Sequence, residues 1–92
     1  MMWRDTAYLQ AEGEKSERKF VYCNEKSIFS AEFHRAGLYG LKPDVMLEVR
    51  TEEYNEEPYV IYKDVKYVIY RKCKSRGGEI TELYGTRKAG EF

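Results

Sequence analysis

The residues that most often perform catalysis or bind metals are sparse in this sequence. It contains one histidine, His34, and two cysteines, Cys23 and Cys73, which are 50 positions apart. Structural zinc sites need several cysteine or histidine ligands, commonly in close pairs such as C-x-x-C, and no such pair occurs. His34 belongs to no recognisable motif that pairs a nucleophile with a base. We therefore expect no catalytic residue, no bound metal and no enzymatic activity, and we expect His34 at a surface or interface.

Two carboxylate pairs, Glu52-Glu53 and Glu56-Glu57, could in principle supply an acid and a base. They lie in a stretch with little apolar cover, so they should be solvated rather than held in the desolvated setting that acid–base catalysis uses. The glycines at 37–40 and 77–78 match neither the dinucleotide-binding fingerprint nor the P-loop. The sequence therefore predicts no cofactor.

Aromatic residues offer a different chemistry. Tyr62, Tyr67 and Tyr70, together with the basic C-terminal stretch, could form a platform on which single-stranded nucleic acid stacks. Tyrosine is equally typical of protein interfaces, because its ring is apolar and its tip is polar. Sixteen basic and sixteen acidic residues give no net charge, so a general positive field for nucleic acid is lacking. A small single-strand-binding barrel is the alternative hypothesis.

Length and composition bound the fold that must position these residues. Ninety-two residues, 42% of them hydrophobic, are enough for one domain, which we take to be 1–92. No apolar run approaches the ~20 residues that span a bilayer, and the first residues lack the apolar core of a signal peptide. We expect a protein made in the cytosol, not bound to a membrane, with both thiols reduced.

Tyrosine, valine, isoleucine and phenylalanine gather in short runs, as in strands. The firmest local prediction is a hairpin of strands 59–62 and 66–73 joined by 63–65, with Val65, Tyr67, Ile69 and Cys73 on one face. The other predicted strands are 3–10, 19–24, 45–50 and 79–85, followed by a frayed tail over 86–92. About six short strands joined by hairpin turns indicate a mainly β protein, a small antiparallel barrel or sandwich.

Between the second and third strands the spacing changes to that of a helix. The segment 27–37 is predicted to be helical, with Ser27 or Ser30 as its cap, because its apolar residues are Ile28, Phe29, Phe33 and Ala36. The stretch 37–44 has two glycines and a proline and should be a connecting loop.

Charge is unevenly distributed along the chain. Residues 47–70 contain three basic and six acidic residues, a net charge of −3, whereas residues 71–92 contain six basic and three acidic residues, a net charge of +3. An acidic edge and a basic edge on one subunit suit head-to-tail packing into a ring. The candidate interface charges are Glu52, Glu53, Glu56 and Glu57 on the acidic side, and Arg87 and Lys88 on the basic side.

Taken in order, several segments resemble the phage head-tail joining family, also called head-closure or stopper proteins. In the first half they are Cys23-Asn24-Glu25-Lys26-Ser27, Ser30-Ala31-Glu32-Phe33-His34-Arg35-Ala36 and Gly40-Leu41-Lys42-Pro43-Asp44. In the second half they are Glu53-Tyr54-Asn55-Glu56-Glu57, Val60-Ile61-Tyr62, Tyr67-Val68-Ile69-Tyr70-Arg71 and Glu79-Ile80-Thr81-Glu82-Leu83-Tyr84. Each segment is weak alone, and their order and separation make the resemblance more specific.

The resemblance implies a small β-barrel with a short helical or loop insertion, assembled as a ring in the virion neck. Its partners would be the portal or adaptor above, the tail terminator below and other copies of itself, with packaged DNA contacted non-specifically at most. Such a ring closes the filled head and offers the tail a docking surface, and assembly takes place in the bacterial cytoplasm. Loops on a rigid scaffold carry function, so the insertion 24–44 is expected to face the channel or the next ring through Phe29, Phe33, Arg35 and Lys42.

Overall fold

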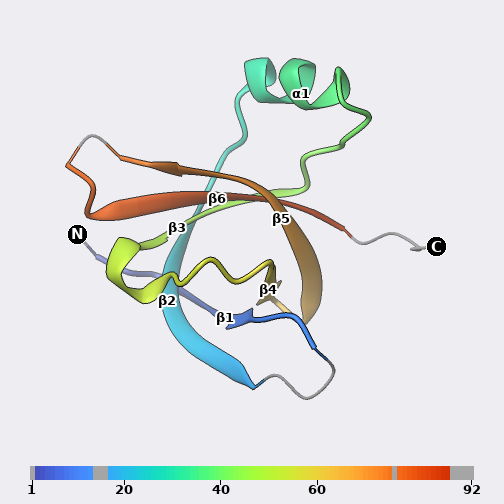
Figure 1. The fold of residues 1–92 in the computed structure, drawn as a ribbon. Helices are drawn as coiled ribbons and strands as arrows, with labels where there is room; N and C mark the ends of the chain where they lie inside the picture. Colours follow the sequence, from blue (N-terminus) through green and yellow to red (C-terminus); the bar gives the residue numbers. More distant parts are fainter. Residues whose placement is uncertain (1, 14–16, 76, 88–92) are drawn as a thin grey trace.

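Six antiparallel strands close into a barrel, and one helix stands beside it (Figure 1). The computed structural model describes residues 2–13, 17–75 and 77–87. Around the barrel the strands follow the order β1-β2-β3-β6-β5-β4. This confirms the predicted mainly β fold and small barrel with one helix. The elements are β1 (Asp5–Gln10), β2 (Arg18–Lys26), α1 (Ser30–Gly37), β3 (Val45–Arg50), the 3-10 turn η1 (Thr51–Glu53), β4 (Tyr59–Tyr62), β5 (Val65–Lys74) and β6 (Ile80–Arg87).

Alternate side chains of the strands point into the barrel and form its core. Leu9, Leu47 and Leu83 are essentially inaccessible to solvent and come from β1, β3 and β6. Val21, Val49 and Val60 complete the innermost group. Burying a leucine or valine side chain stabilises the folded state by about 1.5–3 kcal/mol. This alternation is why the predicted strands lie close to the observed ones.

The hairpin of β4 and β5 turns on Lys63 and Asp64. Both residues have positive φ, 51° and 66°. Two consecutive residues with positive φ match the twist of the flanking strands, which is why such turns are favoured in two-residue hairpins. Tyr62 pairs with Val65 across the turn. The predicted hairpin is confirmed.

The far half of β5 departs from regular alternation. The register between β5 and β6 shifts between Ile69 and Arg71, which marks a bulge. Before the shift, Tyr67 is buried and Ile69 packs against the core; beyond it, Cys73 is exposed. The prediction that Cys73 shares the inward face was wrong, because an extra residue in one strand reverses which face the later side chains occupy.

The last strand is longer than predicted. Thr86 and Arg87, assigned to a frayed tail, continue β6, where Arg87 lies opposite Tyr67. The Arg87 amide donates a 2.7 Å hydrogen bond to the Asp44 carboxylate, which holds this end of the strand. The remainder of the predicted tail lies outside the described residues.

The helix lies within the segment 27–37 that was predicted to be helical. It begins at Ser30, and the residue before it, Phe29, caps it without any side-chain hydrogen bond, so neither predicted serine cap is formed. Its buried residues are Glu32 and Ala36, four positions apart on one face. Of the apolar residues that indicated the helix, Phe29 and Phe33 are exposed.

Candidate functional site

An arm of the chain, residues 27–44, leaves the barrel between β2 and β3 and carries α1. Figure 1 shows α1 standing off the barrel on two extended connections. Asp44 fixes the returning end: its amide donates to the Gly85 carbonyl at 2.9 Å, and its carboxylate accepts from Arg87. The arm is therefore an appendage on a rigid scaffold, a position in which loops commonly carry function.

Large apolar side chains on the arm face solvent. Phe29 is 69% exposed, Phe33 46%, and Leu38 and Tyr39 are each 72% exposed. Exposed apolar groups that gather on one element mark interaction surfaces in soluble proteins. Sequence reasoning singled out Phe29 and Phe33 but passed over Leu38 and Tyr39. Two large apolar residues between Gly37 and Gly40, in a loop with no core to join, were the available signal.

The helix meets the barrel through a buried carboxylate. Glu32 is only 6% exposed. Its oxygens accept hydrogen bonds of 2.7 Å from the Tyr70 hydroxyl and 2.7 Å from the Arg71 guanidinium, both in β5. Arg35, one turn along the helix, adds weaker bonds of 3.4 Å. We call Glu32, Tyr70 and Arg71 the clasp.

The electrostatics of the clasp favour a charged Glu32. Burial disfavours the carboxylate, but the hydrogen bonds from Tyr70 and Arg35 and the charge of Arg71 outweigh it and lower the pKa of Glu32. Burial and the same hydrogen bond raise the pKa of Tyr70, so its hydroxyl stays protonated and can donate. Arg71 also lies over the Tyr84 ring, 4.7 Å from its centroid, which ties the clasp to β6.

The other candidate contacts on the arm divide into two kinds. Lys42 is exposed and free to face a partner. Arg35 is half-buried and turned toward Glu32, so it also serves the attachment of the helix. All four candidates, Phe29, Phe33, Arg35 and Lys42, lie on the arm. Glu32 was not named as a candidate, because helical spacing alone gives no sign that a glutamate is buried.

Three of the four acidic interface candidates are already paired within the chain. Glu53 lies 3.9 Å from Arg50, Glu57 lies 3.2 Å from Lys19, and Glu56 pairs with Lys72. The side chain of Glu57 is only 11% exposed, so the prediction that these carboxylates are solvated was wrong for it. All three pairs offset the charge that a neighbour would meet, and the more exposed ones contribute little to stability. Glu52 and Arg87 are exposed, and Lys88 lies outside the described residues.

Two of the three tyrosines proposed as a nucleic-acid platform are buried. Tyr62 and Tyr67 are 3% and 8% exposed and belong to the core. The Tyr62 hydroxyl donates to Glu25 at 2.9 Å, and Tyr70 is held in the clasp. The stacking hypothesis as formulated from sequence therefore loses Tyr62 and Tyr67.

A different set of aromatic side chains is exposed on the barrel wall. Tyr8, Phe20 and Tyr22 lie on β1 and β2 with ring centroids 5.8 Å and 5.2 Å apart, each pair packed edge to face. They are 40–49% exposed.

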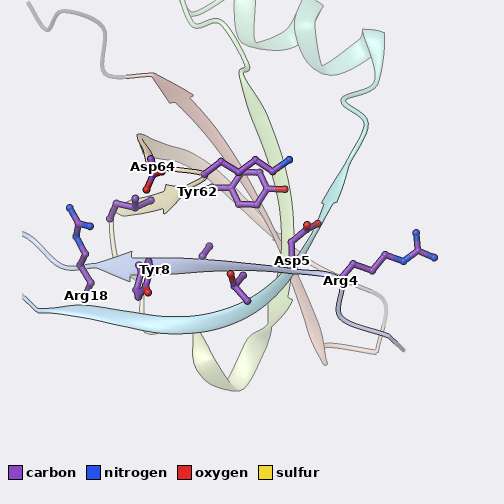
Figure 2. Close-up of a pocket in the computed structure, with 10 residues that line it drawn as sticks. Arg4, Asp5, Tyr8, Arg18, Tyr62 and Asp64 are labelled. Carbon is purple, nitrogen blue, oxygen red and sulfur yellow. The ribbon is translucent and has the colours of Figure 1, made fainter.

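A shallow groove opens where β1 and β4 separate. These strands pair only between Tyr8–Gln10 and Tyr59–Ile61, and beyond that point a cavity of about 350 Å³ lies between them. Figure 2 shows Arg4 and Arg18 at its two ends, with Asp5, Tyr62 and Asp64 between them. Its charges are mixed in sign, and its lining shows no nucleophile beside a base.

Neither a metal centre nor a membrane-spanning helix is found in the described parts of the chain. They hold no cluster of three or more His, Cys, Asp or Glu side chains suited to a metal ion. Within those parts, too, no helix is both long and apolar enough to cross a bilayer. Both cysteines are free thiols, Cys23 in the core and Cys73 at the surface.

Comparison with known proteins adds no relative. No protein-family model matches the chain, and no curated protein sequence matches it. Function must therefore be argued from the fold and from the arm.

Proposed function

We propose that this chain is a structural protein of the phage head–tail connector, not an enzyme. Copies assemble as a ring in the virion neck, below the portal or its adaptor, where they close the filled head and give the tail a docking surface. Assembly takes place in the bacterial cytoplasm, and the partners are neighbouring connector proteins and other copies of this chain. Contact with packaged DNA is at most non-specific.

The observation that carries the proposal is the apolar arm on a closed barrel. The sheet is closed into a barrel, which removes most of the free strand edge, so exposed side chains and appendages are the main means of association that it offers. The arm supplies such an appendage, with Phe29, Phe33, Leu38 and Tyr39 exposed. Many copies in one ring could each contribute a weak contact and together hold firmly. The segment-by-segment resemblance of the sequence to head-closure proteins supports the same role.

The experiment is to remove the chain from an assembling phage or induced prophage that encodes it. Electron microscopy should then show filled or leaking heads without tails, and expression of the protein from a plasmid should restore tailed particles. Normal tailed particles in the absence of the protein would contradict the proposal.

A matched pair of variants locates the function on the arm. Replacing Phe29 and Phe33 together by serine removes apolar surface without touching the core, because both rings are exposed. Complementation should fail for this variant although its melting temperature is unchanged. The control replaces the same two residues by leucine, which keeps the surface apolar and should restore tails.

Binding of single-stranded nucleic acid would contradict the connector proposal. The exposed rings Tyr8, Phe20 and Tyr22 are the surface to examine. Tight binding of an oligonucleotide at ~0.1 M salt, lost on replacing Phe20 by serine, would favour a single-strand-binding barrel over a connector.

A further inference from the structure

The attachment of α1 to the barrel depends on one charged side chain. Within the described residues, the side-chain hydrogen bonds that join α1 to a strand both end on Glu32. A carboxylate is seldom buried unless it is paired, because leaving water is costly for a charge. Here the donors are Tyr70 and Arg71, and the burial is nearly complete. Two well-placed donors therefore fix the position of this buried charge, and with it the position of the helix on the barrel.

The bulge in β5 makes the clasp possible. In a regular strand, consecutive side chains point to opposite faces, so Tyr70 and Arg71 could not both reach one carboxylate. The register shift falls between Ile69 and Arg71, at these very residues. Bulges re-aim side chains in this way. Both side chains therefore converge on Glu32, each at 2.7 Å.

The clasp also sets which face of the helix looks outward. Glu32 and Ala36 are one turn apart and buried. Phe33 lies at the edge of this buried face and is 46% exposed, and Leu38 and Tyr39 continue the exposed surface beyond the helix. If the helix rotated about its axis, the phenylalanine and not the carboxylate would meet β5.

We propose that Glu32 is the positioning residue of the arm. Its carboxylate accepts hydrogen bonds from Tyr70 and Arg71 and thereby holds α1 against the barrel, with the apolar side chains of the arm facing outward. The clasp belongs to the isolated chain. Only its consequence for assembly rests on the proposed connector function.

Hydrogen exchange of the purified protein tests the clasp. Replacing Glu32 by alanine should speed exchange of the amides of 31–38 at least about tenfold while the amides of β3 and β6 keep their protection, because the barrel core is untouched. Glu52→Ala, the same change at an exposed carboxylate, is the control and should leave the arm as in the parent protein. No acceleration in 31–38, or an equal acceleration throughout the barrel, would overturn the proposal.

Removing one donor at a time covers the case in which Glu32→Ala fails to fold. Tyr70→Phe and Arg71→Gln each delete one partner of the carboxylate, so each should produce a smaller acceleration confined to the arm. In a double variant that combines either change with Glu32→Ala, exchange of the arm should be no faster than in Glu32→Ala alone, because the same contact is already lost. Fully additive effects would show that Glu32 acts through other contacts and would also overturn the proposal.

The two proposals can fail separately. If exchange shows the clasp but Glu32→Ala still supports normal tails, then the clasp stands and the connector role is in doubt. If exchange is unaffected in all three variants, the clasp is wrong whatever the phage experiment shows.

Discussion

The hydroxyl of Tyr70 donates a hydrogen bond of 2.7 Å to the carboxylate of Glu32, 38 residues earlier in the chain. One residue lies in the bulged part of β5 and the other on a helix whose large apolar side chains face solvent. A hydrogen bond to a charged group is worth about 1.5–3 kcal/mol, which is substantial for an arm held by few such bonds. The position of the arm therefore depends on polar groups that a hydrophobic pattern does not reveal.

Acid should detach the arm from the barrel only below the ordinary pKa of a glutamate, 4.5. Because the pKa of Glu32 is lowered in the folded protein, the stability that its charge contributes is fully present above the ordinary glutamate value of 4.5 and is lost as the pH falls through the lowered value. The charged groups facing it are Arg35 on the helix and Arg71 on β5, with the Tyr70 hydroxyl between them, and both arginines stay positive.

Amide NMR signals of the arm, followed from pH 7 to pH 2, measure this release. In a His34→Gln background, which removes the imidazole from the helix, they should be constant down to about pH 4.5 and shift only below it. Glu32→Gln carries no titrating carboxylate and should show no such step. A transition of the arm between pH 7 and pH 5 would contradict the assigned direction.

Leu47→Ala should destabilise the barrel strongly. Leu47 is fully buried on β3, and leucine-to-alanine changes in a core cost about 2–5 kcal/mol, a large share of the stability of a small domain. Leu38→Ala is the matched control, because the same atoms are removed from a side chain that is 72% exposed, and its cost should stay within about 0.5 kcal/mol. Urea unfolding measures both. Equal losses would mean that the arm is packed more tightly than the structure shows.

Gly85→Ala should also destabilise, by a different mechanism. A Cβ at Gly85 would lie 2.9 Å from the Tyr67 Cβ and 3.1 Å from a Val45 methyl, inside a closed barrel that cannot expand locally. Overpacking of this kind costs about 1–3 kcal/mol. Gly77→Ala meets no atom within 4 Å and should be close to neutral. Thermal melts of the two variants should therefore differ, and matching melting temperatures would argue against the close approach.

The barrel was predictable because its strands obey a local rule. Alternation of apolar and polar residues defined 45–50, and two apolar runs joined by a short turn defined the hairpin 59–62 with 66–73, nearly to the residue. The errors arose where a non-local contact overrides that rule. The bulge after Ile69 reverses the faces of β5, and the Asp44 carboxylate extends β6 to Arg87.

The candidate site was predictable in place but not in detail. A change to helical spacing located the arm, and two of the candidates named on it, Phe29 and Phe33, are exposed; their contact with a neighbour stays a prediction. Helical spacing does not show which face is buried when that face carries a carboxylate rather than an apolar stripe. Glu32 is buried only because Tyr70 and Arg71 lie opposite it, and no pattern within 27–37 contains that information.

Thiol labelling tests the bulge directly, because it decides on which side of the barrel wall Cys73 lies. Cys73 is exposed, whereas Cys23 has no accessible surface, and burial raises the pKa of the Cys23 thiol to about 12. The thiolate is the reactive form, so Cys23 should be protected both by access and by protonation. A disulfide reagent at pH 8 should label one thiol in the native protein and two in denaturant, and Cys73→Ser should remove the native signal. Slow labelling of both thiols in the native protein would place Cys73 inside the barrel, and β5 would then have to run without the register shift on which the convergence of Tyr70 and Arg71 depends.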